Sequence, residues 1–356
     1  MVVSSESDAY DWAKAVKEFD EAKSGVKGLV DAGVTELPRL FVHPAEHLLD
    51  LSNPTDPDLP TIDFAGPRRE VVEAVRRASQ EWGFFRMVNH GVPRQTMDAM
   101  LDAARRFHEQ PAEEKAPLYS DDSRRRVRFS SNSALREKDA ASWRDILTCV
   151  FNDDEIDTEL IPEACRAEVL EYVERMIELR ETMAEVMSEA LGLPSNYLSE
   201  MECMKSEAMA CLYYPVCPEP RKTLGTPKHS DTTFLTLLMQ DDIGGLQILH
   251  GGQWVNVPPV PGALIANIGD LMQIISNDKF ISVEHRVVAQ PVGPRISVAC
   301  FFTPSMSAVA KPFGPIKELL SDENPAIYKK FMFRDYCQYY KMKGQDVPST
   351  LPHYKI

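Results

Sequence analysis

His229-Ser230-Asp231 places two groups that bind divalent metals at a spacing suited to one ion. If this stretch is a strand, His229 and Asp231 point to the same face, because side chains alternate along a strand. The best candidate for a third ligand is His285, which lies in a later β-like run. Two histidines and one carboxylate leave adjacent coordination positions open, which suits oxygen chemistry at Fe(II). Zinc accepts the same ligands and is the alternative metal.

Arg295 and Ser297 form a second feature, shortly after His285 in another β-like run. An arginine that faces the inside of a barrel is costly unless an anion accompanies it. Guanidinium binds carboxylate through two parallel hydrogen bonds, and the serine hydroxyl adds a donor. We therefore expect a dicarboxylate at this point, with a structural Arg–Asp pair as the alternative. Alternation predicts Ala299 and Phe301 on this same face, and a second set on the opposite face: Ile296, Val298, Cys300 and Phe302.

The elements that must position these residues divide the chain into a helical half and a β half. Hydrophobic periodicity predicts helices over 67–82, 95–108 and 162–191, with a strand at 84–88. From about 208 to 304, seven or eight short apolar runs follow without intervening helices, which indicates a jelly roll or barrel. A tight hairpin is expected at His250 to Gln253, and a helical tail at 324–343. We expect a mixed region at 1–206, a core at 207–310 and a tail at 311–356, forming one catalytic unit.

Composition excludes several classes of protein. The 356 residues carry 39 Lys and Arg against 54 Asp and Glu, a net charge of −15. This excess of acid disfavours nucleic acids and anionic membranes as partners. The first residues lack the basic start and apolar run of a secretory signal. No window is apolar enough to span a membrane, and the seven cysteines are scattered. We expect a cytoplasmic monomer that binds a small molecule.

Further motifs accompany these residues in a fixed order. They are LPTIDF at 59–64, WGFFRMVNHGVP at 82–93, YYPVCP at 213–218, HSD, GGLQ at 244–247, NIGD at 267–270, SVEHRV at 282–287 and RIS. In this order they resemble the plant 2-oxoglutarate- and Fe(II)-dependent dioxygenases. GVKGLVD at 25–31, followed by Gly33, resembles the branch called aminocyclopropane-carboxylate-oxidase homologues. That branch includes hydroxylases of plant alkaloids and benzoxazinoids.

The resemblance implies a mainly β fold, with a double-stranded β-helix (jelly-roll, cupin-like) core, an N-terminal helical region and a C-terminal helix. It implies hydroxylation, desaturation or ring closure of a small hydrophobic specialised metabolite, using O2 and releasing succinate and CO2. Ascorbate is expected to support activity. The residues it assigns to Fe(II) are His229, Asp231 and His285, and those it assigns to 2-oxoglutarate are Arg295, Ser297 and Tyr214. One departure is Leu212, because the family often has asparagine there.

A substrate pocket is expected around Phe301 and Thr233, with Phe234, Phe129 and Trp143 as further candidates. Three alternative functions remain open. The first is an ascorbate-dependent oxidase of the ethylene-forming type, in which Arg295 and Ser297 would bind an amino-acid carboxylate. The second is a barrel that binds a small molecule without catalysis. The third is a demethylase of nucleic acids or histones, which the acidic charge disfavours.

Overall fold

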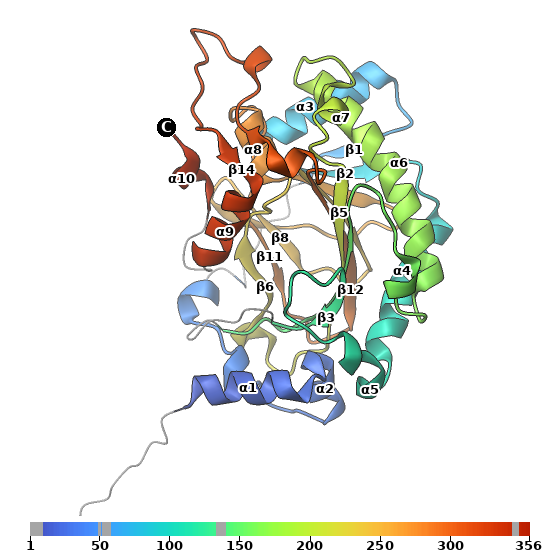
Figure 1. Cartoon of the computed structure of the whole chain (residues 1–356). Coiled ribbons are helices and arrows are strands. Elements are labelled where there is room, and N and C mark those ends of the chain that lie inside the picture. Colours follow the sequence, from blue (N-terminus) through green and yellow to red (C-terminus); the bar gives the residue numbers. More distant parts are fainter. Residues whose placement is uncertain (1–9, 49–50, 52–57, 133–139, 344–348) are drawn as a thin grey trace, which may run out of the picture.

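Two β-sheets pack face to face in the computed structural model, which describes residues 10–48, 51, 58–132, 140–343 and 349–356 (Figure 1). Within these residues, the larger sheet has eight strands and the smaller has four. In spatial order the larger sheet contains β1 (Thr61–Asp63), β2 (Phe84–Val88), β10 (Leu264–Ile268), β7 (Leu235–Gln240), β12 (Arg295–Thr303), β5 (Ser206–Tyr214), β4 (Asp145–Phe151) and β3 (Val127–Ser130). The smaller sheet contains β6 (Leu224–His229), β11 (His285–Val288), β8 (Leu246–His250) and β9 (Gln253–Asn256). The fold is the expected double-stranded β-helix.

Helices cover the outer face of the larger sheet. Helix α4 lies against β5 and β12, and α6 packs beside α4 and α3 (Figure 1). The bounds of the helices are α1 (Trp12–Ala22), α2 (Gly25–Asp31), α3 (Arg68–Glu81), α4 (Arg94–Glu109), α5 (Ala112–Lys115), α6 (Arg166–Ala190), α7 (Tyr197–Glu200), α8 (Asp270–Ile275), α9 (Phe333–Lys343) and α10 (Leu351–Tyr354). The three helices predicted between 67 and 191 are confirmed as α3, α4 and α6. None of the described helices combines the length and the apolar run needed to cross a membrane.

Alternation along the strands builds two separate apolar layers. On β12, Ile296, Val298, Cys300 and Phe302 pack beneath the helices, whereas Ala299 and Phe301 face the space between the sheets. This is the predicted division. We call the layer between the sheets the inner cluster, whose buried members are Leu59, Phe84, Ala210, Leu212, Tyr214, Leu246, Ile248, Val255, Val257, Ile265, Val283, Val287 and Ala299.

The structure corrects the sequence analysis at several elements. Helix α8 interrupts the β half between β10 and β11, where no helix was expected. The helical tail begins only at Phe333, after the short hairpin of β13 (Pro312–Phe313) and β14 (Phe331–Met332). Strands β1 to β4 come from the N-terminal region yet extend the larger sheet, so that sheet continues across the boundary at 206. The hairpin after His250 is confirmed, because Gly251 and Gly252 have the positive φ angles, 57° and 79°, that a two-residue loop requires.

Asp145 connects the N-terminal helices to the sheet. Its carboxylate accepts hydrogen bonds from the backbone N–H groups of Val26 and Lys27, each at 2.8 Å, and from the Ser131 hydroxyl. The approach requires a glycine at position 25, because a Cβ there would lie 2.4 Å from a carboxylate oxygen of Asp145. The GVKGLVD segment therefore serves to dock α2 on β4.

Glu207, at the start of β5, is a buried carboxyl group that makes pH-dependent stability a testable property. Burial raises its pKa to about 7, although the Cys300 thiol and the Arg180 charge oppose the rise. The folded protein therefore holds a proton that the unfolded chain releases, so the unfolding free energy falls as the pH rises from about 4.5 to about 7. The full effect of this group is about 3 kcal/mol.

Glu207→Gln is expected to abolish the fall in unfolding free energy between pH 4.5 and about 7 that Glu207 causes, because glutamine stays neutral at every pH. Urea unfolding at pH 5, 6, 7 and 8 should show the variant gaining stability over the wild type as the pH rises. Glu174→Gln, at an exposed position of α6, is the control and should follow the wild type. A constant difference between Glu207→Gln and wild type across this range would contradict the assignment.

Candidate active site

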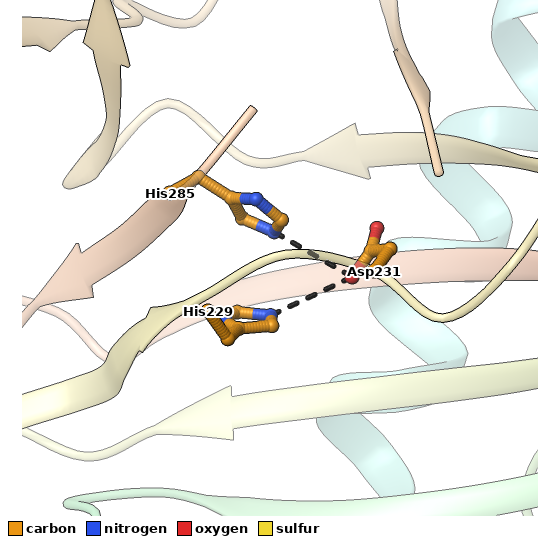
Figure 2. A group of neighbouring side chains, drawn as sticks. All are labelled: His229, Asp231 and His285. Carbon is orange, nitrogen blue, oxygen red and sulfur yellow. Dashed lines mark ion pairs between the residues drawn. The ribbon is translucent and has the colours of Figure 1, made fainter. Parts of the chain in front are cut away.

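His229 and His285 meet through the pairing of two strands. His229 ends β6 and His285 begins β11, and the antiparallel register places the two residues directly opposite each other. Asp231 completes the group, and one ligand atom from each of the three residues lies within 4.8 Å of the others (Figure 2). Among the described residues this is the one group of three or more His, Cys, Asp or Glu side chains that could hold a metal ion.

Asp231 lies just beyond the end of β6 and not within a strand, so its approach does not come from strand alternation as predicted. The chain turns after His229 and brings the carboxylate back toward both histidines (Figure 2). Its Oδ1 is 3.6 Å from Nε2 of His229 and 3.7 Å from Nε2 of His285. One oxygen and two nitrogens thus face a common point, with the spacing of ligands around one small cation.

Backbone carbonyl groups fix the orientation of both imidazole rings. Nδ1 of His229 lies 2.9 Å from the Pro227 oxygen, and Nδ1 of His285 lies 3.2 Å from the Val283 oxygen. A carbonyl can only accept, so Nδ1 carries the proton and Nε2 presents its lone pair. Burial, together with the neighbouring His285, lowers the pKa of His229 to about 3. The His229 ring is therefore neutral, as a metal ligand must be.

Two donors hold the second oxygen of Asp231. The Thr236 hydroxyl and the Asn267 side-chain amide each donate to Oδ2 at 2.7 Å. Burial alone would raise the pKa of Asp231, but the two histidines and these hydrogen bonds keep it below its ordinary value. The sequence analysis did not single out either donor, although Asn267 belongs to the NIGD motif. Thr233, expected in the substrate pocket, instead bonds Thr236 at 3.2 Å.

Asn267→Ala is expected to weaken Fe(II) binding by about 10- to 100-fold, since partners that orient a metal ligand have effects of that size. The cause is that Oδ2 loses one of its two donors and the carboxylate is free to rotate. Titration of the apoprotein with Fe(II) under nitrogen measures the change. Asn196→Ala, at an exposed position, removes an amide far from Asp231 in sequence and should leave the affinity unchanged. Equal Fe(II) affinities of Asn267→Ala and wild type would show that the amide does not support the ligand.

Asp270 ties the C-terminal segment to the loop that carries Asp231. Its backbone N–H donates to the backbone carbonyl oxygen of Asp231 at 2.8 Å. Its carboxylate Oδ2 accepts from three hydroxyl groups: Ser230 at 3.1 Å, Tyr336 of α9 at 2.6 Å and Thr350 at 3.1 Å. Helix α9 is thereby fixed beside the two sheets (Figure 1). The C-terminal tail is thus part of the support for the site.

Arg295 lies inside the barrel with only 1% of its surface exposed. It donates to Ser297 and to Gln240, each at 3.0 Å, while its Nε has no partner among the described residues. Asp241 is the nearby acid, but its carboxylate accepts from the backbone N–H groups of Ile296 and Ile243. The alternative of a structural Arg–Asp pair is therefore not what the described residues form. A buried guanidinium with an unused donor fits an anionic ligand.

Tyr214 and Leu212 lie opposite these residues on β5. Tyr214 pairs with Arg295 and Leu212 with Ser297, and the guanidinium carbon is 4.8 Å from the centre of the Tyr214 ring. The Tyr214 hydroxyl bonds Thr226 at 3.2 Å. Leu212 belongs to the inner cluster, so an apolar surface stands where the resemblance leads one to expect an amide.

The predicted pocket residues separate into different layers. Phe301 packs against the inner cluster, on the same face as Arg295. Phe234 instead packs on Phe313 in the outer layer, and Phe129 packs there with Phe107. Trp143 packs against Phe41 beneath the N-terminal helices. These last three placements correct the prediction, because the three side chains pack in the outer layer or beneath the N-terminal helices and not in the inner cluster.

The sequence of the chain is similar to those of known proteins. Residues 205–304 match the family model of the 2OG-Fe(II) oxygenase superfamily, and residues 59–166 match that described as non-haem dioxygenase in morphine synthesis N-terminal. The chain is 47% identical over 356 residues to the 1-aminocyclopropane-1-carboxylate oxidase homolog 1 of Arabidopsis thaliana, with 98% of each chain covered. The chain belongs to the 2OG-Fe(II) oxygenase superfamily.

Two further similarities, to a plant hydroxylase and to a solved structure, show which branch of the superfamily this oxygenase belongs to. It is 44% identical to deacetoxyvindoline 4-hydroxylase of Catharanthus roseus, covering 96% of this chain and 89% of the relative. Its fold matches the crystal structure of JOX2 in complex with 2OG, Fe and JA with a TM-score of 0.81, at 29% identity, covering 93% of this chain and 97% of that one. The protein is thus a dioxygenase of the plant branch, and its cofactors are Fe(II) and 2-oxoglutarate.

Proposed function

We propose that this oxygenase hydroxylates a small, mainly apolar specialised metabolite and releases succinate and CO2. In this proposal His229, Asp231 and His285 hold Fe(II), while the distal carboxylate of 2-oxoglutarate binds Arg295, Ser297 and Tyr214. The observation that carries the proposal is the convergence of three metal-binding atoms on the same interior as a buried Arg295 with an unused donor. A metal site alone would not require that cation.

The residues of the chain bind and orient the reactants. Arg295 fixes one end of the co-substrate by charge and geometry, so its other end is directed toward the metal ligands. The inner cluster, with Phe301 at its edge, excludes water and offers an apolar surface to the substrate. Bound iron and 2-oxoglutarate supply the activation of O2 and the oxidation of a C–H bond. The similarity to deacetoxyvindoline 4-hydroxylase supports a specialised metabolite as substrate.

We also infer how the enzyme is organised and where it works. The segments 1–206, 207–310 and 311–356 act as one catalytic unit, since strands from the first and Tyr336 from the last support the core. The enzyme is proposed to be a cytoplasmic monomer. Its net charge of −15 supports the view that neither nucleic acid nor a membrane is a partner.

Turnover assays distinguish the proposal from its alternatives. The purified protein, incubated with Fe(II), ascorbate and 2-oxoglutarate, is expected to release succinate and CO2 in equal amounts, faster when a metabolite extract is added. Ethylene formed from aminocyclopropane carboxylate without 2-oxoglutarate would instead support the ethylene-forming oxidase. Iron binding without any succinate release would support the non-catalytic barrel. Either result would contradict the proposed function.

A further inference from the structure

Arg144 is a second cation on the inner side of the barrel. It directly precedes β4, where Asp145 pairs with Tyr213 and Ile146 pairs with Leu212. Side chains alternate, so Arg144 shares the face of Ile146, which packs against the inner cluster. The Arg144 guanidinium donates to the Thr226 hydroxyl of β6 through Nη1. It therefore reaches across from the larger sheet to the smaller one, three residues before the metal ligand His229.

The charge of Arg144 has no anionic partner among the residues that the structure describes. Its guanidinium donates to a neutral hydroxyl, and its Nε is buried without a hydrogen-bond partner in that part of the chain. Most other arginines of this acidic protein bind a carboxylate or a backbone carbonyl, as Arg180 does with Asp154 at 2.6 Å. A partly buried guanidinium with an unused N–H is costly in an apolar interior unless an anion reaches it.

The position of Arg144 differs from that of Arg295. Arg295 lies over the Tyr214 ring, whereas Arg144 meets the same Thr226 that the Tyr214 hydroxyl contacts. Thr226 and His229 both belong to β6, three residues apart, so the contact with Thr226 places the Arg144 guanidinium on the side of the proposed metal ligands.

We infer that Arg144 binds a carboxylate group of the substrate and so holds it beside the metal ligands. The inference rests on the proposed function, in which the distal carboxylate of 2-oxoglutarate is already bound by Arg295, Ser297 and Tyr214. One guanidinium and the adjacent Thr226 match a planar monoanion, which takes two parallel hydrogen bonds. The apolar remainder of such a substrate would lie on the inner cluster. The substrate class is therefore an apolar carboxylic acid rather than a neutral metabolite.

Matched acids and esters test this assignment. The probes are 3-phenylpropanoate and 3-(indol-3-yl)propanoate, each beside its methyl ester, added under nitrogen to the protein loaded with Fe(II) and 2-oxoglutarate. Binding is read from the change in the visible absorption of the loaded protein. The wild type is expected to bind the acids at least about 10-fold more tightly than the esters, since only the acids make the charged pair. Arg144→Met is expected to weaken acid binding by about 30-fold and to leave ester binding unchanged.

Two further variants make the result specific. Arg144→Lys keeps the charge without the planar fork and should retain part of the preference for acids. Arg175→Met removes a cation from α6, on the other side of the larger sheet, and should behave as wild type. The inference is wrong if no acid changes the wild-type spectrum at millimolar concentration, or if Arg144→Met keeps the preference. It is also wrong if Arg144→Met weakens the binding of 2-oxoglutarate and not that of the acids. A wild type that never forms the loaded complex would instead overturn the proposed function.

Discussion

Replacing Asp231 with alanine is expected to abolish Fe(II) binding and with it succinate release. Its Oδ1 is the atom that both histidine Nε2 atoms approach, at 3.6 and 3.7 Å, so its removal leaves only two neutral ligands. Loss of a ligand must cost more than the roughly 100-fold that loss of a supporting partner costs. Asp231→Asn should fail as well, because the amide keeps the shape of the side chain but not its charge. Metal content after dialysis against Fe(II), measured with the succinate rate, gives the result.

Asp242→Ala is the matched control, because Asp242 is an exposed acid on the loop after β7. It should retain one Fe(II) per chain. The variant at position 231 also loses the contacts with Thr236 and Asn267, so urea unfolding must show that it remains folded. A folded Asp231→Ala protein that still binds one equivalent of Fe(II) would rule out the proposed ligand set.

The second large effect is expected at Arg295. Arg295→Met should raise the KM for 2-oxoglutarate by about 100-fold, which corresponds to about 3 kcal/mol for one half of a buried charge pair. Its effect on Fe(II) affinity should be small, since none of the metal ligands contacts this guanidinium in the described structure. Arg295→Lys should raise the KM for 2-oxoglutarate by less, because lysine keeps the positive charge although it lacks the planar pair of N–H donors of guanidinium. Initial rates over a range of 2-oxoglutarate concentrations measure the change.

Thermal unfolding separates ligand binding by Arg295 from a purely structural role. Without 2-oxoglutarate, Arg295→Met should be as stable as the wild type or more stable, because a buried cation without an anion is replaced by an apolar chain. With saturating 2-oxoglutarate, the wild type should gain stability and the variant should not. Arg175→Met should gain as the wild type does. A variant that is destabilised without 2-oxoglutarate, yet gains normally with it, would show that Arg295 is structural.

Local patterns in the sequence predicted much of the fold. Periodicity fixes helix α6 and the two faces of β12, because each residue there depends on neighbours a few positions away. Strand β6 is harder to recognise, since LGTPKH contains proline and little alternation. The joining of β3 and β4 to β5 depends on pairing between distant segments, which no local pattern encodes. Helix α8 has only six residues, and the backbone N–H of Leu271 in its first turn donates to the backbone oxygen of the distant Thr233, so a local pattern does not reveal it.

In the site too, residue type and order predicted some of the residues, whereas others depend on the fold. Two histidines and an aspartate could be chosen by residue type and order, and the structure brings their side chains together. The supporting groups were not chosen, because Asn267 and Tyr336 are ordinary polar residues until the fold places them beside Asp231 and Asp270. Some aromatic residues were predicted to line the pocket but do not. Phe129, Phe234 and Trp143 have the composition of a pocket, but packing places them in other layers.

Anaerobic absorption spectroscopy is the most direct test of the proposed active site. The wild-type protein, mixed with one equivalent of Fe(II) and then titrated with 2-oxoglutarate, is expected to develop a weak metal-to-ligand charge-transfer band in the visible. The band should be absent in Asp231→Ala and His285→Ala, and Arg295→Met should need about 100-fold more 2-oxoglutarate to reach it. A wild type without the band, or an Asp231→Ala variant that retains it, would contradict the assignment of His229, Asp231 and His285 as the ligands of iron.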